Sequence, residues 1–358
     1  MSVIQISDRK DTDKRFVYRV DLDAKPLGSG GMGKVFRGEC YDNATKHVRD
    51  VAVKFLFDNQ PDGVIDRARR EASIRLRNDN LVEMIDFVEV EQQVPHGTIL
   101  RYHVVSELLQ GVMLLDLLQG KTTDAEGHAV PYARELYNLY KSNPDAFALK
   151  IVKNVLNGLL ALHNAGYIHR DLDPSNIMIT ADRKIKIIDF GIAKRVDTLS
   201  HNDRQLTSVG QFMGKAAYAA PELISGDLQN QNQTTDLYAV GIILYVLIVG
   251  ELPFTGKLAD IMNMQLTQPI PVKNISNKKI RKIISKATQK GQEKRYQSAA
   301  SFIVDLEDAD TGRTVSPKPS PSVASVGGGG SNKAAQIAIW AAAIIGGLAV
   351  GFFVATLI

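Results

Sequence analysis

The chain has 358 residues, of which 44% are hydrophobic, which is enough for one large or two ordinary globular domains. Its net charge of +4 is small and spread along the chain, which argues against a nucleic-acid-binding surface of clustered Lys and Arg. Cys40 is the single cysteine, so no intrachain disulfide can form, and we expect an ordinary packed thiol in a reducing compartment.

The N-terminal third is predicted to be rich in β-structure. Residues 1–15 are polar and charged, which predicts a tail without a signal peptide, so the start of the chain is expected to stay where it is made. From about residue 16 to 109, short β-branched runs alternate with polar residues, as in Val51–Val53. One helical stretch, from about 64 to 77, interrupts them.

A glycine-rich segment, Leu27–Val35, carries Gly28, Gly30 and Gly33. Glycine allows a backbone to fold tightly and to bring its N–H groups against phosphate oxygens. The same spacing also opens dinucleotide-binding folds, but the sequence after Gly33 continues as a strand, which disfavours that reading. Taken alone, a simple glycine-rich hairpin remains the alternative.

Lys54 ends the apolar strand that starts at Val51, so its ammonium is expected to project from a mostly buried strand. A buried cation needs a partner, because desolvating it alone costs several kcal/mol. Glu71, in the predicted helix, is the candidate, and a surface pair of Glu71 with Arg75 is the alternative.

The central and C-terminal parts are predicted to be mostly helical. Apolar residues recur at helical spacing or run continuously at 147–163 and 236–249. Residues 121–145 are interpreted as an extra polar insertion without a readable role.

The most informative feature is the run His169–Asn176, followed by Asp189-Phe190-Gly191. It supplies one carboxylate to orient a hydroxyl nucleophile, together with an amide oxygen and a second carboxylate of the kind that magnesium requires. The residues between, 177–188, have room for two short strands joined by a turn at 181–183. Such a hairpin would bring Asn176 and Asp189 close together.

This arrangement resembles the catalytic and metal-binding loops of the protein kinase family, over residues 18–308. The resemblance implies an α+β, two-lobed fold with a small N-lobe at 16–109 and a larger helical C-lobe at 110–310. It implies Asp171 as the catalytic base, and Asn176 and Asp189 as ligands of Mg²⁺ or Mn²⁺. It also implies that Glu71 holds Lys54 on the phosphates of ATP.

Other positions follow from the same resemblance. His169 is expected to be a packed scaffold residue, and Arg170 to offer donors to an activation-loop phosphate. Ser106 matches the residue at the back of the adenine slot, where a small side chain predicts a deep pocket. The implied ATP-binding residues are Leu27, Gly28, Ser29, Gly30, Gly31, Met32, Gly33, Val35, Ala52, Lys54, Ser106, Glu107, Leu109 and Ile179.

Three further residues indicate which kind of kinase the chain resembles. Glu222 of Ala220-Pro221-Glu222 is expected to pair with Arg295, and Asp236 to tie down the catalytic loop. Small-molecule kinases of related fold generally lack this set, so a protein substrate is favoured. With Gly30-Gly31-Met32-Gly33 in the first loop, the chain resembles bacterial membrane-anchored Ser/Thr kinases.

The chain departs from the family pattern at two positions. Asp173 stands where Ser/Thr kinases usually carry lysine, and Lys215 where they carry threonine after the glycine, here Gly214. Our hypothesis is that the charges are exchanged, with Lys215 paired to Asp173 beside the γ-phosphate. The alternative is drift in a nucleotide-binding pseudokinase that acts as a scaffold. A small-molecule kinase is a third reading.

Candidate sites of self-phosphorylation lie in the activation segment. They are Thr198, Ser200, Thr207 and Ser208. An ordinary solvated loop is the alternative.

The end of the chain changes composition abruptly. Residues 311–333 are rich in Ser, Pro and Gly and are predicted to be a flexible tether. Residues 334–358 carry no charge and are long enough to span a bilayer, with a buried helix of the globular domain as the alternative. The flanking charges Arg313, Lys318 and Lys333 are all positive, which predicts a cell-membrane protein with a cytoplasmic kinase domain.

Glycines in the predicted span bear on association. Close contact between two spans at Gly346, Gly347 and Gly351 would allow a homodimer. The alternative is that they are merely small residues that face lipid.

Overall fold

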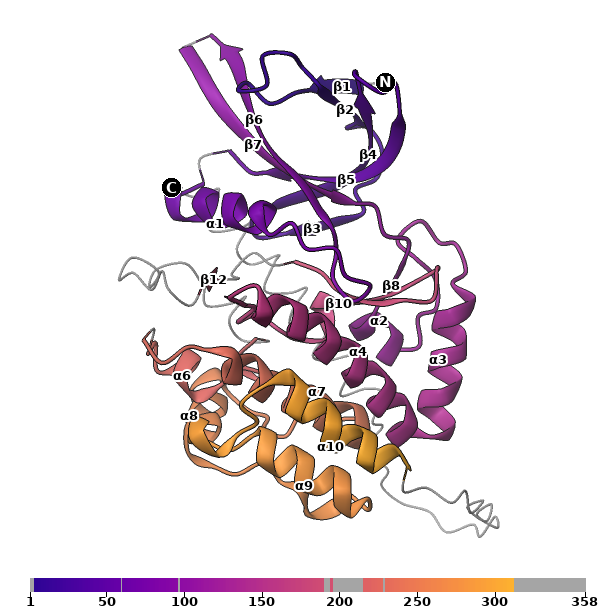
Figure 1. Ribbon diagram of the computed structural model, residues 1–358, viewed down its shortest axis with the longest axis vertical. Helices are drawn as coiled ribbons and strands as arrows, with labels where there is room; N and C mark the ends of the chain where they lie inside the picture. The colour runs from indigo at the N-terminus through magenta and orange to yellow at the C-terminus, as the bar shows by residue number, and fades with distance from the viewer. Residues whose placement is uncertain are drawn as a thin grey trace.

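The computed structural model describes residues 3–58, 60–95, 97–189, 194–195, 215–227 and 229–311. These residues form a strand-rich N-terminal lobe and a helical C-terminal lobe that lie one above the other (Figure 1). The predicted two-lobed α+β architecture is confirmed. The tether, the membrane span, Phe190, Gly191, Gly214 and the four candidate phosphorylation sites lie outside the described residues.

The N-lobe is built on a seven-stranded antiparallel sheet in the order β1-β2-β4-β5-β7-β6, with β3 paired to β4 (Figure 1). Apolar side chains that alternate along these strands form its core, including Tyr18, Val53 and Val105. The strands are β1 (Val3–Ile6), β2 (Phe16–Asp21), β3 (Gly28–Gly30), β4 (Gly33–Asp42), β5 (Val48–Leu56), β6 (Met84–Val94) and β7 (Gly97–Glu107).

The predicted polar tail at residues 1–15 is wrong for its first part. β1 pairs with β2 in antiparallel register, with Ile4 opposite Val20, and Ile6 is buried in the N-lobe core. Arg9 Nε donates to Glu89 Oε2 at 3.1 Å, which fixes the following turn to β6. A four-residue strand has little signal of its own, because its hydrogen bonds come from a neighbour distant in sequence.

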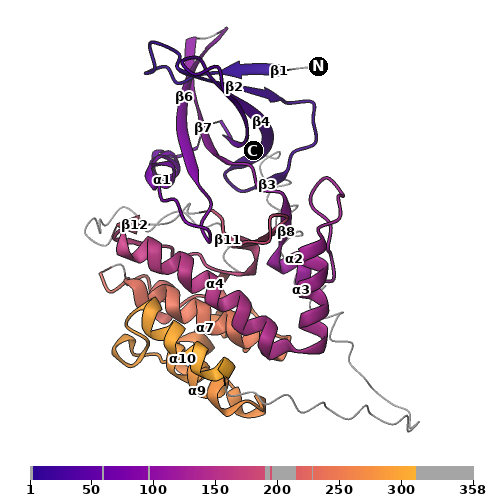
Figure 2. The ribbon, with the colours of Figure 1, turned by 45° about the vertical axis from the view of Figure 1, so that its right-hand side comes forward.

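The single helix of the N-lobe is α1 (Asp62–Ser73), which packs beside β6 and β7 (Figure 2). It ends four residues before the predicted end at 77. Ile74 leaves the helical region with φ −79° and ψ 78°, so the remaining residues connect irregularly to β6.

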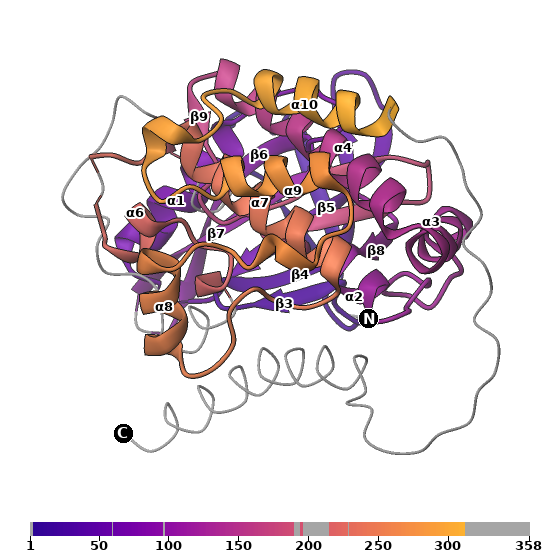
Figure 3. The same cartoon turned by 90° about the horizontal axis from the view of Figure 1, so that it is seen from below.

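The C-lobe consists mainly of helices, with α4 and α7 at its centre (Figure 2). The predicted helices at 147–163 and 236–249 lie within α4 and α7. The helices are α2 (Leu114–Leu118), α3 (Pro131–Ser142), α4 (Pro144–Asn164), α6 (Pro221–Ile224), α7 (Gln233–Val249), α8 (Leu258–Thr267), α9 (Lys278–Ala287) and α10 (Ala299–Thr311). Seen from below, these helices lie over the strands of the N-lobe (Figure 3).

The segment read as a polar insertion, 121–145, also needs correction. Its second half is the helix α3, which buries Tyr132, Ala133 and Leu136 against the C-lobe core. Tyr137, Leu139 and Tyr140 also pack against this core, so α3 docks through apolar positions that are interspersed with polar ones.

Two small sheets lie between the lobes and carry the motifs. The first has the order β11-β10-β8, formed by Ile185–Ile187, Ile177–Thr180 and Gly111–Met113. The second pairs β9 (Tyr167–Ile168) with β12 (Lys194–Arg195). The C-lobe also contains short 3₁₀ helices at Pro174–Asn176, Val272–Asn274 and Gln292–Lys294.

Within the described parts of the chain, α4 is the one helix long and apolar enough to cross a membrane by length and composition. Its apolar residues, among them Ile151, Val155 and Leu159, are buried in the C-lobe. It is therefore a core helix.

The close approach of α7 and α9 gives a test of this packing. A Cβ added at Gly241 would lie 2.7 Å from both Ala287 Cβ and Thr288 Cγ2. We expect Gly241→Ala to destabilise the protein by about 1–2 kcal/mol, because the steric cost exceeds the gain in helix propensity. Urea unfolding measures this change.

The matched control adds Ala287→Gly to the same variant. This second change makes room for the new methyl group, so the two substitutions should be less destabilising together than the sum of their separate effects. A Gly241→Ala protein more stable than the parent would contradict the packing.

Candidate active site

The glycine-rich segment forms a tight hairpin. Gly28 lies opposite Val35 and Gly30 opposite Gly33, so Gly31 and Met32 make the turn. Gly33 is required by packing, since a Cβ there would lie 2.0 Å from the carbonyl oxygen of Phe55. A Cβ at Gly28 or Gly30 would meet no atom within 4 Å. The outer side of the hairpin, with the exposed Ser29, is therefore open, as a phosphate-contacting loop requires.

One face of the N-lobe sheet lines the predicted adenine slot. Val35 lies opposite Lys54, and Ala52 lies opposite Ser106. All four are half-buried, whereas their neighbours on the other face, such as Val53, are fully buried. Alternation along the strands thus presents these four side chains together on one face.

On the C-lobe side of the slot, the predicted role of Ile179 is wrong. Ile179 on β10 has no exposed surface and packs in the C-lobe core, so it cannot touch a base. Met178, next to it, is half-buried and points to the opposite face of the strand. Met178, rather than Ile179, therefore faces the predicted adenine slot.

The segment joining the lobes follows β7. The Glu107 N–H donates to the Glu83 carbonyl at 2.9 Å, so any adenine contact at this residue belongs to its carbonyl oxygen. Its carboxylate accepts from Lys186 Nζ at 2.6 Å, and Lys186 also donates to the Leu81 carbonyl at 2.9 Å. Sequence reasoning missed Lys186, a buried cation on β11 that ties this linker to the strand leading to Asp189. The half-buried Leu109 follows.

Lys54 faces Asp189 across the cleft. Its ammonium lies 3.7 Å from Asp189 Oδ2. Burial lowers the pKa of Lys54, but the charges of Asp189 and Glu71 outweigh this effect and raise the pKa overall. Glu71, predicted as the ion-pair partner, is buried and acts on Lys54 through its charge, while the direct salt bridge is with Asp189.

The loop that carries Asp171 is fixed by one carboxylate. Asp236 Oδ2 accepts from the His169 N–H at 2.8 Å, and Oδ1 accepts from the Arg170 N–H at 2.7 Å. His163 Nε2 lies 2.8 Å from the same Oδ2. Burial raises the pKa of Asp236, but these hydrogen bonds and the charge of His163 hold it below its usual range. The role predicted for Asp236 fits this geometry, and His163 is a further member that the sequence reading missed.

These bonds also hold a strained backbone. Arg170 has φ +66°, a conformation that non-glycine residues rarely adopt. Its guanidinium donates to Gln231 Oε1 at 3.0 Å. His169 is fully buried, and burial lowers its pKa, so its neutral ring can accept the Asp171 N–H at Nδ1, 3.3 Å away. His169 is therefore a packed scaffold residue, as predicted.

Asp171 and Lys215 form an ion pair in the cleft. The predicted partner of Lys215 was Asp173, and that pairing is wrong. Asp173 Oδ1 instead accepts from the N–H and hydroxyl of Ser175, at 2.6 and 2.5 Å, which caps the 3₁₀ turn after it. Asp173 still acts on Lys215, because its charge and that of Asp171 overcome burial and raise the pKa of Lys215.

The surroundings of Asp171 change the pKa of its carboxyl group. Burial raises its pKa to about 6, helped by the negative charges of Asp173 and Asp189 and opposed by Lys215. A carboxyl group that titrates near neutrality is suited to accept a proton in a reaction at physiological pH.

The two predicted metal ligands lie at adjoining strand ends. β10 and β11 pair with Ile177 opposite Ile187, and the Ile188 N–H donates to the Asn176 carbonyl at 2.9 Å. The hairpin predicted over 177–188 is therefore confirmed. The Asn176 amide nitrogen donates to the Asp171 carbonyl at 2.7 Å, which leaves the amide oxygen as a possible ligand. Asp189, at φ +62°, follows directly.

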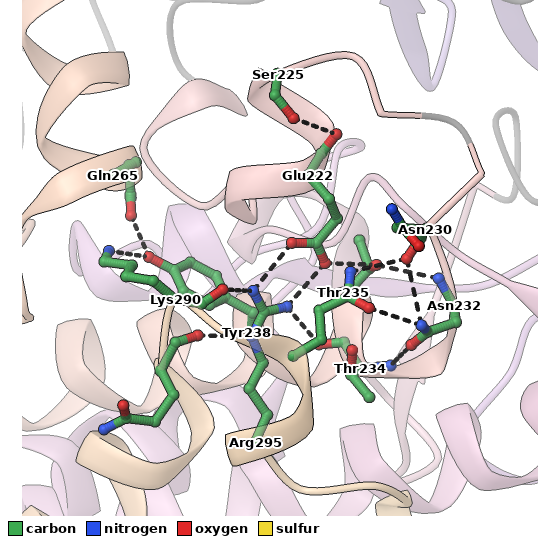
Figure 4. A network of polar contacts seen from close by, with 12 residues as sticks. Glu222, Ser225, Asn230, Asn232, Thr234, Thr235, Tyr238, Gln265, Lys290 and Arg295 are labelled. Carbon is green, nitrogen blue, oxygen red and sulfur yellow. Dashed lines mark hydrogen bonds and ion pairs between the residues drawn. The ribbon is translucent and has the colours of Figure 1, made fainter.

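A second polar network lies in the C-lobe (Figure 4). Arg295 donates to both carboxylate oxygens of Glu222, at 2.8 and 2.9 Å, as predicted. Thr235 Oγ1 also donates to Glu222, at 2.7 Å. Tyr238, at its edge, donates to Gln265 Oε1 at 2.5 Å and accepts from Lys290. This network joins the start of α6, the first turn of α7 and the 3₁₀ turn at Gln292–Lys294.

Comparison with known proteins agrees with this geometry. A family model described as protein kinase domain matches residues 22–306, and the chain belongs to this family. The chain is 32% identical over 292 residues to a probable serine/threonine-protein kinase of Clostridium perfringens, covering 78% of this chain and 37% of that protein.

Two other relatives are similar. The serine/threonine-protein kinase pkn3 of Myxococcus xanthus is 31% identical, over 85% of this chain and 53% of that protein. PknB of Mycobacterium tuberculosis is 30% identical, over 83% and 43% respectively. The chain thus spans about half or less of the length of these relatives.

The Arg295–Glu222 pair predicts a large loss of stability when it is broken. Arg295→Leu would leave the Glu222 carboxylate buried beside an apolar side chain, and we expect a cost of about 3–5 kcal/mol in unfolding free energy. Chemical denaturation followed by circular dichroism measures it.

The control is Arg77→Leu. Arg77 makes a 3.1 Å salt bridge to Glu83, but its side chain is 87% exposed, so its loss should cost less than about 1 kcal/mol. Equal losses in the two variants would show that the buried network has no special role in stability.

Proposed function

We propose that this protein is an ATP-dependent Ser/Thr protein kinase. The observation that carries the proposal is the position of Asp171, half-buried and ion-paired to Lys215, on a loop that also supplies Asn176 and is joined through the β10–β11 hairpin to Asp189. Similarity to kinases named as serine/threonine-specific supports the choice of hydroxyl acceptor.

Several described residues have distinct roles in the proposed phosphoryl transfer. Asp171 accepts a hydrogen bond from the substrate hydroxyl and directs its oxygen at the γ-phosphorus. The new P–O bond forms as the bond between the γ-phosphorus and the β–γ bridging oxygen breaks, and the hydroxyl proton passes to Asp171. Lys54 and the hairpin at Gly28–Gly30 hold the phosphates of ATP, and Lys215 places a positive charge beside the reacting oxygens.

The chemistry of the donor set fits a divalent cation. Asn176 offers an amide oxygen and Asp189 a carboxylate, both of which are hard oxygen ligands. When bound, Mg²⁺ or Mn²⁺ neutralises charge on the phosphates. The orientation of the Asn176 amide, fixed by its bond to the Asp171 carbonyl, prepares one of these ligands.

Protein substrates and a membrane location complete the proposal. Glu222, Asp236 and Arg295 are the set that favours a protein substrate, and their contacts are those described above. The uncharged segment 334–358 and its positive flank support a single span with the kinase domain on the cytoplasmic side. Dimerisation through the glycines of that segment is a further part of the proposal.

Substitution of Asp171, the proposed base, tests the proposal. We expect Asp171→Asn to reduce transfer of label from [γ-³²P]ATP to protein by roughly 10²–10⁴-fold, because the hydroxyl is no longer oriented or deprotonated. Mass spectrometry of the wild-type chain incubated with ATP and Mg²⁺ should find phosphate between residues 191 and 214.

Two results would contradict it. Label transfer equal in wild type and Asp171→Asn, with nucleotide still bound, would indicate a pseudokinase. Turnover that requires a metabolite and labels no protein would indicate a small-molecule kinase.

The exchanged charges predict a shift in pH dependence. Ionised Asp171 is the active form, so activity should fall as the pH drops through about 6. Lys215→Ala removes the charge that lowers this pKa, so the acidic limb of kcat/KM should move to higher pH, with roughly 10²-fold slower transfer at its plateau. Asp173→Asn should move the limb to lower pH.

The double variant Asp173→Lys with Lys215→Thr supplies the control. It restores the charge arrangement usual in the family and should recover transfer lost in Lys215→Ala. An unchanged rate in Lys215→Ala would refute the role given to Lys215.

A further inference from the structure

Helix α9 presents a strongly basic surface. Its ten residues, KKIRKIISKA, include five cations and no carboxylate. One face packs into the C-lobe through Ile280, Ile283 and Ile284. The cations are therefore left on the outer face: Lys278, Lys279, Arg281, Lys282 and Lys286.

Acidic residues of α10 balance only one side of this helix. Lys279 pairs with Asp308 at 2.9 Å, and Lys286 pairs with Asp305 at 3.3 Å. Among the described residues, the exposed Lys278, Lys282 and Lys294 form no ion pair.

Next to these ion pairs, α9 borders a shallow, open hollow whose lining residues include no carboxylate. It is lined by Arg281, Lys282, Ser285, Lys286, Gln289 and Lys294. Glu293, the acidic neighbour of Lys294, turns back over Gly291, with Oε1 2.4 Å from where a Cβ on that glycine would stand. The hollow is thus positive and bears hydroxyl and amide groups that can donate hydrogen bonds to anions.

The basic surface has a defined place in the molecule. α9 lies at the end of the C-lobe away from the N-lobe sheet, and α10 ends beside it at Thr311 (Figures 1 and 2). The chain after Thr311 carries only positive charges, Arg313, Lys318 and Lys333, before its uncharged segment.

We propose that the outer face of α9, with Lys278, Lys282 and Lys294, docks on the anionic headgroups of the bilayer to which the C-terminal segment leads. This inference rests on the proposed membrane anchoring. Each lysine near an anionic surface strengthens binding about fivefold. A Ser- and Gly-rich linker of roughly 20 residues is expected to span about 25 Å, so weak attraction beside an anchored segment acts at high local concentration.

The shape of the surface favours a bilayer over a phosphorylated peptide. The cations are spread along an exposed helix about 15 Å long and on the turn after it, rather than converging on one point. Of the lining cations, Arg281 has its guanidinium held by the Ile275 carbonyl, at 3.1 and 2.6 Å, and Lys286 is paired to Asp305. A bilayer surface presents negative charge over the whole length of such a helix.

Lysine footprinting of the full chain tests the proposal. The protein is reconstituted in phosphatidylcholine vesicles with or without phosphatidylserine, and lysines are acetylated with an amine-reactive reagent and quantified by mass spectrometry. We expect Lys278, Lys282 and Lys294 to react at least about fivefold more slowly with phosphatidylserine present, and high salt to abolish the difference. Lys14 and Lys46, exposed on the N-lobe, should react equally in both.

A charge-matched pair of variants gives a second measurement. Lys278, Lys282 and Lys294 are changed to Gln in one protein, and the exposed Lys14, Lys46 and Lys257 in the other. Phosphatidylserine should slow acetylation of Lys279 and Lys286 in the second protein and not in the first. Similar label-transfer activity in detergent would establish that both are folded.

The proposed membrane anchor and the proposed docking surface can be tested independently. Flotation with phosphatidylcholine vesicles at high salt reports the anchor alone. If that flotation is absent but salt-sensitive flotation with phosphatidylserine depends on the three lysines, the docking surface stands without the anchor. Equal acetylation in both lipids despite flotation, or protection by a phosphopeptide and not by phosphatidylserine, would overturn the proposal.

Discussion

The carboxylate of Asp236 is the constraint on which the active site depends. It is buried at the first turn of α7, where the positive end of the helix dipole favours a negative charge. Because it accepts the N–H groups of both His169 and Arg170, it stabilises the left-handed conformation at Arg170. That conformation sets the direction of the next residue, Asp171. Without this anchor, a strained backbone worth about 1–3 kcal/mol would relax.

Charge balance in the cleft is the second determinant. Asp171, Asp173 and Asp189 lie in the same cleft, where burial of Asp171, together with the negative charges of Asp173 and Asp189, raises the pKa of Asp171. Lys54 and Lys215 offset part of this charge from opposite lobes. The position of Lys215 explains the departure from the family pattern at residues 173 and 215. An ammonium still contacts Asp171, the proposed base, although it comes from a different segment. A cleft with surplus negative charge also suits a divalent cation.

The sequence predicted the elements whose signals are local. The β10–β11 hairpin, the strand after Gly33, and helices α4 and α7 each follow from periodicity or turn residues in one segment. It placed Ile179 in the adenine slot by resemblance, yet side-chain alternation about that strand puts Met178 there. It missed β1 and α3 because a short strand, and a helix in which apolar and polar residues are mixed, are stabilised by the surfaces they pack on rather than by a strong local signal.

The sequence by itself determined the family and the two lobes, and it singled out Lys54, Asp171, Asn176 and Asp189 as candidate site residues, because the spacing of polar residues between apolar elements can be read along the chain. Only the tertiary structure decided which charges meet. Lys215 contacts Asp171 rather than Asp173, and Lys186 reaches Glu107. Such pairings depend on distances of a few ångströms between segments far apart in the chain, and Coulomb energy in a buried cleft makes those distances decisive.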